Sequence, residues 1–406
     1  MLGRRSARPS ARSASGPPAP SRVLQRDELD VHGEGIIGDG ALERVGAVAY
    51  GPEGIRARFG ELSVGAWLAI GWMVFVVLIA VLAKTHVLTW GDPQAVSADC
   101  ARKGPFAQDG SAPGHFFGCD TDGRDMVARL ALGAWTSLLV SFGAIAFGFI
   151  IGGGLGLVAG YFSDKPSRPI AAVVGGLFGA AFGVVAFGVI GGALIGMPDG
   201  LAALIGGVGG LAGGAYWGFH HGDTDTLITN MFNVMLSVPA IVLALALVAF
   251  LQGSEAAGTK AVLPDVLILI LAIGIVAVPL VGRISRGSAL TWSQRDFVLA
   301  ARAQGAQHGR IMFREVLPNV APALFSISLL SVAIAIVAEG TLAILGVGVR
   351  PPDPSWGNII ALDRNALFTS PHIVFEASFM IFATVLALNY LGDVVRARFD
   401  VRESGI

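Results

Sequence analysis

Long apolar stretches divide this chain. A helix needs about 20 apolar residues to cross the hydrocarbon core of a membrane, which is roughly 30 Å thick. The stretches are continuous, whereas barrel strands alternate in polarity over about ten residues, so they predict helices. We therefore expect an all-α integral membrane protein with about eight spans. These stretches cover approximately residues 64–83, 130–160, 169–197, 200–219, 228–252, 265–282, 320–348 and 373–392.

The composition supports a membrane protein. Hydrophobic residues make up 53% of the 406 residues and charged residues only 14%. A charged fraction this low leaves too little polar surface to cover soluble domains, which excludes the soluble globular classes. The formal net charge of -1 gives no argument for a nucleic-acid partner, and two cysteines are too few for a disulfide scaffold.

The basic residues predict the orientation. Most of the 28 Lys and Arg residues precede the first stretch, lie within residues 283–314 or follow the last stretch. With a cytoplasmic N-terminus and eight crossings, all three segments fall in the cytoplasm, where short loops retain basic residues. We therefore expect both termini in the cytoplasm. Residues 1–60 should form a largely disordered N-terminal extension, because residues 1–26 contain no acid and are rich in Arg, Ser, Ala and Pro.

The segment 165–222 is unusually rich in glycine. Several of its glycines are spaced by four residues, which places them on one helix face and lets another helix approach closely. We expect a hairpin of two tightly packed membrane helices, joined at residues 197–200. Docking of an extra subunit is the alternative use of these faces. The spaced glycines are Gly175, Gly179, Gly183, Gly188, Gly192, Gly196, Gly206, Gly210, Gly214 and Gly218.

Three motifs suggest chemistry but fail in detail. Residues 253–260 resemble a phosphate-binding loop, yet Thr259 precedes Lys260 and no strand leads into it. Residues 154–159 match a dinucleotide motif but lie within a membrane stretch. His220 and His221 project about 100° apart on a helix and have no evident partner cluster for a metal. We expect no catalytic residues, no metal site and no cofactor bound by this chain.

Four segments resemble the permeases of ABC importers of the OppC/DppC kind, which carry dipeptides and oligopeptides. Residues 297–319 are similar to the EAA loop, and residues 117–125 are similar to the family segment F-G-T-D-x-x-G-R-D. Residues 345–358 and 391–393 match further family signatures in the same order. Leu299 stands where the loop often has Glu, and Cys119 replaces the usual Thr. The matched outer motif contains Asp120, Gly123, Arg124 and Asp125.

The resemblance implies a six-helix type I importer permease core with the glycine-rich hairpin inserted into it. It divides the chain into the N-terminal extension 1–60, the first span, outer loop and second span 61–164, and the hairpin 165–222. The permease core 223–395 follows, with a cytoplasmic coupling loop at 283–319, and a cytoplasmic tail covers 396–406. In the family the coupling loop fits the ATPase subunit.

The residues of the loop themselves predict a helix, a hinge and a second helix. Asp296–Gln304 is a good helix former, Gly305 can break it through a left-handed turn, and His308–Val316 continues as a short helix before Leu317 and Pro318. Such a hinged basic pair can enter a groove on a partner, whereas the alternative is a helix on the membrane surface. The expected ATPase-coupling residues are Ala300, Ala301, Gly305, His308, Met312, Leu317 and Pro318.

Two features outside the loop leave alternatives open. Glu339 lies deep in the seventh stretch, where an ionisable group is costly, so we expect it to line a pathway or to be paired structurally. Cys100 and Cys119 both fall in the outer loop, where oxidation is allowed, and we expect a disulfide rather than two free thiols.

The resemblance predicts a permease subunit in a bacterial plasma (inner) membrane. It would form half of the pathway of an ATP-driven, binding-protein-dependent importer of di- or oligopeptides. Its partners would be a homologous second permease, two cytoplasmic ATPase subunits that bind ATP and Mg, an extracytoplasmic peptide-binding protein and membrane lipid. Nickel or glutathione as the solute, and a passive channel or membrane scaffold, are the alternatives.

Overall fold

The computed structural model describes residues 63–85, 94–105, 115–164, 167–195, 199–221, 223–252 and 263–400. Every regular element within these ranges is a helix. The predicted N-terminal extension, the tight joint of the hairpin near residue 197, the loop 253–260 and residues 401–406 lie outside them. Residues 396–400, expected in the C-terminal tail, continue the last helix, α14 (Pro371–Asp400).

Six helices within the described ranges are long and apolar enough to cross a membrane. They are α3 (Val64–Lys84), α4 (Met126–Tyr161), α6 (Asp199–His221), α9 (Asp265–Ser293), the continuous run from α11 (His308–Ile311) through α12 (Leu317–Ile344), and α14. The bent pair α7 (Thr224–Ser237) and α8 (Ala240–Gln252) makes seven if it counts as one span. The remaining predicted stretch is α5 (Arg168–Ile195), in which Arg168–Val184 counts as a shorter apolar helix.

The predicted span over residues 228–252 is broken by a bend in the structure. Helices α7 and α8 meet at a bend of 87°. Val238, between them, has φ -93° and ψ 133°, which is an extended conformation. Pro239 favours this break, because a proline ring disfavours the helical conformation in the residue before it. Apolar length therefore did not reveal the break.

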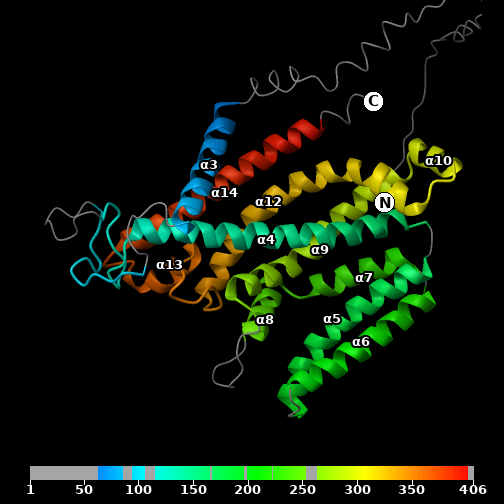
Figure 1. Cartoon of the computed structure of the whole chain (residues 1–406), viewed down its shortest axis with the longest axis horizontal. Coiled ribbons are helices and arrows are strands. Elements are labelled where there is room, and N and C mark those ends of the chain that lie inside the picture. Colours follow the sequence, from blue (N-terminus) through cyan, green and yellow to red (C-terminus); the bar gives the residue numbers. More distant parts are fainter. Residues whose placement is uncertain are drawn as a thin grey trace, which may run out of the picture. The chain divides into compact units, whose positions relative to one another are not determined.

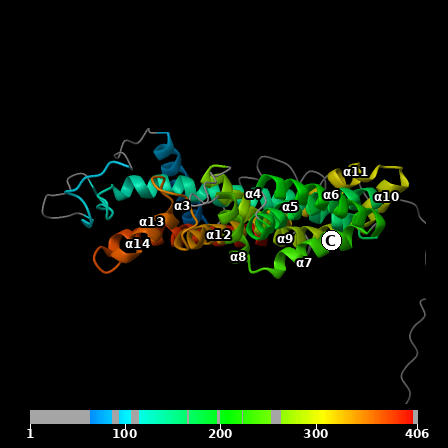
Figure 2. The same ribbon diagram turned by 90° about the horizontal axis from the view of Figure 1, so that it is seen from below.

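Helices α4 and α9 form the centre of the bundle, and they pack together along the second half of α4 (Figure 1 and Figure 2). Small residues make this approach close. A Cβ added to Gly152, Gly156 or Gly160 of α4 would overlap a backbone carbonyl oxygen of α9. Helices α3, α12 and α14 pack on the same core, whose apolar side chains include Leu138, Ile268, Leu269, Ile336 and Trp356.

The glycine-rich segment forms a tightly packed helix pair, α5 and α6. A Cβ on Gly179 would overlap the carbonyl oxygen of Gly210, and one on Gly183 would overlap that of Gly206. Each opposite glycine has the reciprocal contact, so the two backbones touch where side chains are missing. The predicted pairing of these two glycine faces is confirmed for the described glycines.

Candidate functional site

Helix α4 connects the two places where the sequence signatures gather. Asp125 caps its N-terminus, and Tyr161 is its last residue. A helix of 36 residues is about 54 Å long at 1.5 Å per residue. The outer motif and the disulfide lie at one end of this helix, called here the disulfide end. The α9–α12 connection, residues 294–316, lies at the other (Figure 1).

The α9–α12 connection begins with a short helix that ends in a Schellman motif. Helix α10 (Asp296–Ala303) is followed by Gly305, whose φ is 77°. The Gly305 N–H donates to Arg302 O (2.9 Å), and the Ala306 N–H donates to Ala301 O (3.1 Å). These two bonds satisfy carbonyl groups at the end of α10, and they require a left-handed backbone conformation at Gly305. The backbone of Gly305 thus has the conformation that the sequence predicted.

The connection is held to the bundle by one face only. Val298, Ile311 and Val316 are completely buried, against a cluster that includes Leu157 and Leu324. Other side chains of the connection are largely exposed within the described chain. Leu299 is 52% exposed and Phe313 is 60% exposed, and Ala300, Gly305 and His308 are exposed as well. An apolar side chain therefore stands in the exposed position where the family often has Glu.

Tyr161 links α4 to both parts of this connection. Its hydroxyl lies 3.0 Å from His308 Nδ1, within hydrogen-bond distance. The Arg302 guanidinium lies 5.7 Å from the centre of its ring, in a cation–π contact. The Tyr161 side chain is itself buried. One residue at the end of α4 thus contacts a residue before the Gly305 turn and a residue after it.

The predicted end of the second short helix before Leu317 and Pro318 was wrong. Helix α11 passes through a π-helical turn (Met312–Val316) directly into α12. The Leu317 N–H donates to Met312 O, which is the wider π spacing. Pro318 has no N–H, and its ring would clash with a carbonyl in a regular α-helical turn, so the widened turn accommodates it without ending the helix.

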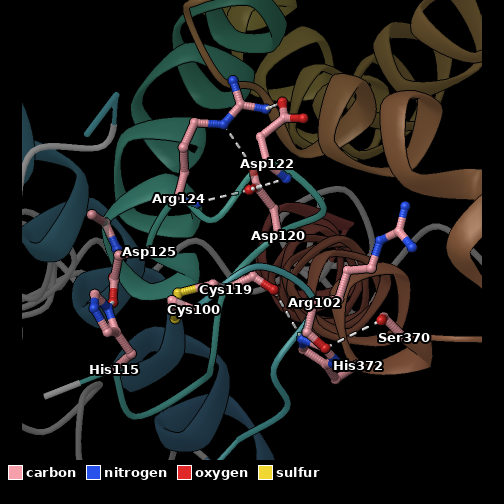
Figure 3. The surroundings of a disulfide bond; sticks show 11 residues. Cys100, Arg102, His115, Cys119, Asp120, Asp122, Arg124, Asp125, Ser370 and His372 are labelled. Atoms are coloured by element: carbon pink, nitrogen blue, oxygen red, sulfur yellow. Dashed lines mark hydrogen bonds and ion pairs between the residues drawn. A yellow bond between two sulfur atoms is a disulfide. The ribbon is translucent and has the colours of Figure 1, made fainter. Parts of the chain in front are cut away.

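At the disulfide end, the outer motif folds around the buried carboxylate of Asp120. Its Oδ1 accepts the backbone N–H groups of Asp122 (3.0 Å) and Arg124 (2.8 Å), and its Oδ2 accepts Arg124 Nε (2.7 Å) (Figure 3). Gly123 has φ 86°, and a Cβ there would overlap Ser97 O. The motif therefore forms a tight turn, which the hydrogen bonds to the Asp120 carboxylate close.

Asp125, the last residue of the motif, turns the chain into α4. Its Oδ1 accepts the Ala128 N–H (2.8 Å), which caps the helix, and its Oδ2 lies 2.5 Å from His115 Nδ1. A disulfide joins Cys100 and Cys119 beside it, the pair put forward from the sequence (Figure 3). His115 and the two sulfurs lie close enough together to hold a metal ion. Sulfurs joined in a disulfide are not thiolates, however, so they are not metal ligands in this form.

Two further buried charges extend the motif beyond its own segment. Arg129, one turn into α4, lies 3.3 Å from Asp120 Oδ2, and Asp363 accepts a hydrogen bond from the Thr121 hydroxyl. Asp363 ends the short helix α13 (Trp356–Asp363). Burial raises the pKa of the Asp363 carboxyl, an effect that the Thr121 hydrogen bond opposes. The motif thus connects α4 to α13.

Glu339 is completely buried and hydrogen-bonded within the chain. Its Oε1 accepts the Ser355 hydroxyl (2.7 Å) and its Oε2 accepts the Ser137 hydroxyl (3.2 Å). Ser137 in turn accepts the backbone N–H of Trp356 (3.1 Å). Glu339 therefore joins α12 to α4 and to the start of α13. The sequence left pathway lining and structural pairing open for Glu339, and these contacts are those of structural pairing.

Sequence reasoning missed Tyr161, Arg129, Asp363 and Ser137. Partners far along the chain fix the places of Tyr161, Asp363 and Ser137, such as His308 for Tyr161, 147 residues away. Arg129 pairs with nearby Asp120. The available signals were weak. Arg129 borders an apolar stretch, and Ser355 precedes an apolar turn as a helix cap does.

Comparisons with known proteins find sequence similarity to transport proteins. Residues 210–404 match the family described as "Binding-protein-dependent transport system inner membrane component". The chain is 27% identical over 345 residues to the dipeptide transport system permease protein DppC of Alkalihalophilus pseudofirmus, covering 85% of this chain and 89% of that protein. It is 29% identical to the di/tripeptide transport system permease protein DppC of Pseudomonas aeruginosa, covering 82% and 87%.

Two other similarities differ in the solute that they name. The glutathione transport system permease protein GsiD of Pectobacterium atrosepticum is 26% identical and covers 72% of this chain and 74% of that protein. Among solved structures, an inward-facing MetNI methionine ABC transporter has a TM-score of 0.43 and 18% identity, covering 67% of this chain and 97% of that chain.

Proposed function

Since the chain is an OppC/DppC-like ABC permease, a transporter subunit and not an enzyme, we propose that it forms half of the translocation pathway of an importer for di- or oligopeptides. Its partners would be a second, homologous permease, two cytoplasmic ATPase subunits that hold ATP and Mg, and an extracytoplasmic binding protein. ATP binding and hydrolysis on the partners would bias an equilibrium between inward- and outward-facing states.

The observation that carries this proposal is the geometry of the α9–α12 connection. It is a capped short helix fixed to the bundle by buried Val298 and Ile311, while Leu299 and Phe313 are left exposed beyond it. A passive channel or scaffold has no use for a rigid, half-apolar projection of this kind. A partner groove that covers Leu299 would account for it, because burying an exposed apolar side chain in a groove is favourable.

The departure at Leu299 gives the proposed contact a definite chemistry. The ATPase groove would receive a leucine where related loops often present a carboxylate. Leu299→Ala should weaken assembly with the ATPase subunits, and Leu299→Glu should weaken it further, because a charge would then be buried without a designed partner. Ala303→Ser, an exposed change on the same helix, serves as the control.

The test is reconstitution of the complete transporter in liposomes, with uptake and ATP hydrolysis measured together. Uptake of a dipeptide that depends on ATP and on the binding protein is the expected result. Glutathione is the second solute to test, because GsiD proteins are also similar to this chain. Uptake without ATP would identify a channel, and copurification without any ATPase subunit would contradict the proposed assembly.

A further inference from the structure

A cavity of about 900 Å³ lies between α3, α4 and α14 at the disulfide end of α4. It is separate from the α9–α12 connection. Its wall is apolar and largely aromatic, and such walls with a few polar groups are typical of binding sites for small molecules. The lining side chains include Trp72, Phe75, Phe117, Phe375, Phe379 and Met380.

Two acidic residues, Asp125 and Glu376, also line this cavity, and they differ in their hydrogen bonds. Both oxygens of Asp125 have partners, namely the Ala128 N–H and His115. The Oε2 atom of Glu376 is buried and has no hydrogen-bond partner among the described residues. A buried carboxylate oxygen without a donor is costly, so the cavity offers an acceptor that a ligand can satisfy.

The surroundings of Glu376 restrict what that ligand can be. The unpartnered oxygen accepts hydrogen bonds, so the ligand must bring a donor. A cationic donor binds most strongly, because its charge stabilises the ionised form of the carboxyl group. Aromatic faces also attract cations. The side chains of Phe75, Phe375 and Phe379 are 49%, 66% and 57% exposed, so the cavity wall continues onto an apolar outer surface of the helices. The rest of the ligand should therefore be apolar.

We propose that this cavity binds molecules that carry a protonated amino group on an apolar body, with the amino group at Glu376. Two sources have this chemistry: ethanolamine lipids of the membrane, and hydrophobic peptides with a free amino terminus. The site lies outside the coupling contact. A lipid ligand goes beyond the proposed function, whereas a peptide ligand rests on it.

Three photoreactive probes with the same twelve-carbon chain test the proposal on the complete transporter. They end in an amine, an alcohol and a carboxylate, and cross-linked peptides are identified by mass spectrometry. The amine should label the cavity segments of α3 and α14 far more than the other two probes do. Equal labelling by all three would overturn the proposal, because it would show an apolar surface without selectivity for an amine.

Two variants test whether Glu376 causes the preference for the amine probe. Glu376→Gln keeps the size of the side chain and should lower amine labelling roughly tenfold, the factor that about 1.4 kcal/mol of binding free energy gives. Asp99→Asn changes an exposed acid at the same end and should have no effect. Unchanged labelling of Glu376→Gln would overturn the proposal. Where Glu376→Gln fails to assemble, Val127→Phe fills the cavity and should remove amine labelling from an assembled transporter.

Competition distinguishes the two sources. Phosphatidylethanolamine in nanodiscs should compete with the amine probe if the natural ligand is a lipid, with phosphatidylcholine as the control. Leucyl-leucine should compete if the ligand is a peptide, with its N-acetylated form as the control. Competition by neither source would overturn the proposal, since the cavity would then lack a natural occupant of this chemistry.

Discussion

At the scale of single residues, Gly305 and Gly309 lie close together in one exposed connection but differ in backbone conformation. Gly305 has φ 77°, whereas Gly309 lies in helix α11 with an ordinary φ. A Cβ would contact nothing within 4 Å at either position. Replacing them therefore separates the effect of backbone conformation from the effect of space.

Gly305→Val should uncouple transport from ATP hydrolysis. A β-branched residue at positive φ costs on the order of 1 to 3 kcal/mol, or forces the two helices to realign. The protein should still reach the membrane, because no packing within the bundle changes. Uptake and substrate-stimulated ATP hydrolysis by the reconstituted transporter are the measurements, with Gly309→Val as the matched control. Normal coupled transport by Gly305→Val would refute the hinge.

Asp363 predicts a pH dependence of stability. Burial raises the pKa of its carboxyl above the ordinary value of about 3.9, so the folded state binds the proton more tightly than the unfolded state. The stabilisation is complete below the ordinary pKa and declines as pH rises through the raised one. Asp363→Asn should flatten this decline in thermal unfolding midpoints of the detergent-solubilised protein between pH 4 and 8. Asp353→Asn, an exposed acid, should leave it unchanged.

At the scale of helices, Tyr161 makes the end of α4 a support for the α9–α12 connection. Tyr161→Phe removes the hydrogen bond to His308 and should cost about 1 kcal/mol. Tyr161→Ala also removes the contact with Arg302 and creates a cavity, so it should cost about 3 kcal/mol or more. Limited proteolysis of residues 294–307 should become faster in the order wild type, Phe, Ala. Equal rates in all three would show that α4 does not hold the connection.

The α5–α6 pair offers an internal control for its glycine contacts. A Cβ on Gly210 would overlap the Gly179 carbonyl oxygen, whereas one on Gly213 would contact nothing within 4 Å. Gly210→Val should separate the helices and cost more than about 1 to 3 kcal/mol, the usual effect of overpacking. Gly213→Val on the same helix should have little effect. Thermal stability of the purified protein distinguishes them, and similar losses in both would contradict close helix contact.

The helices differ in how far the sequence could predict them. Apolar length is enough for α3, α4 and α9, because each is one uninterrupted helix. Apolar length does not predict the break at Val238, where the following proline favours an extended backbone within an apolar stretch. It also fails for α13, since eight residues carry too short a pattern to recognise.

At the scale of the whole molecule, the predicted orientation is testable through the two ends of α4. The proposed function requires the disulfide end outside the cell and the α9–α12 connection in the cytoplasm. Asp353→Cys and Gln307→Cys each introduce an exposed thiol, and the native cysteines are joined in a disulfide. An impermeant maleimide should label Asp353→Cys in intact cells and Gln307→Cys only after permeabilisation. Labelling of both in intact cells would contradict the topology.

The candidate site was predictable only as far as it is local in sequence. The turn at Gly305 and the motif from Asp120 to Asp125 form from neighbouring residues, so their spacing carries the information. The hydrogen bond between Thr121 and Asp363 joins residues 242 positions apart. Such a pair depends on how α4 and α13 pack, which one sequence does not reveal. The cavity beside Glu376 is hidden for the same reason.

The residues on either side of the glycine-rich helix pair are in contact with each other. The Thr224 hydroxyl, at the start of α7, donates to Ser167 O (3.2 Å), just before α5. The chain therefore leaves the permease core and returns to it at one point. A segment with this geometry can be gained or lost in a single genetic event, because the flanking residues already lie close enough for a short link to join them.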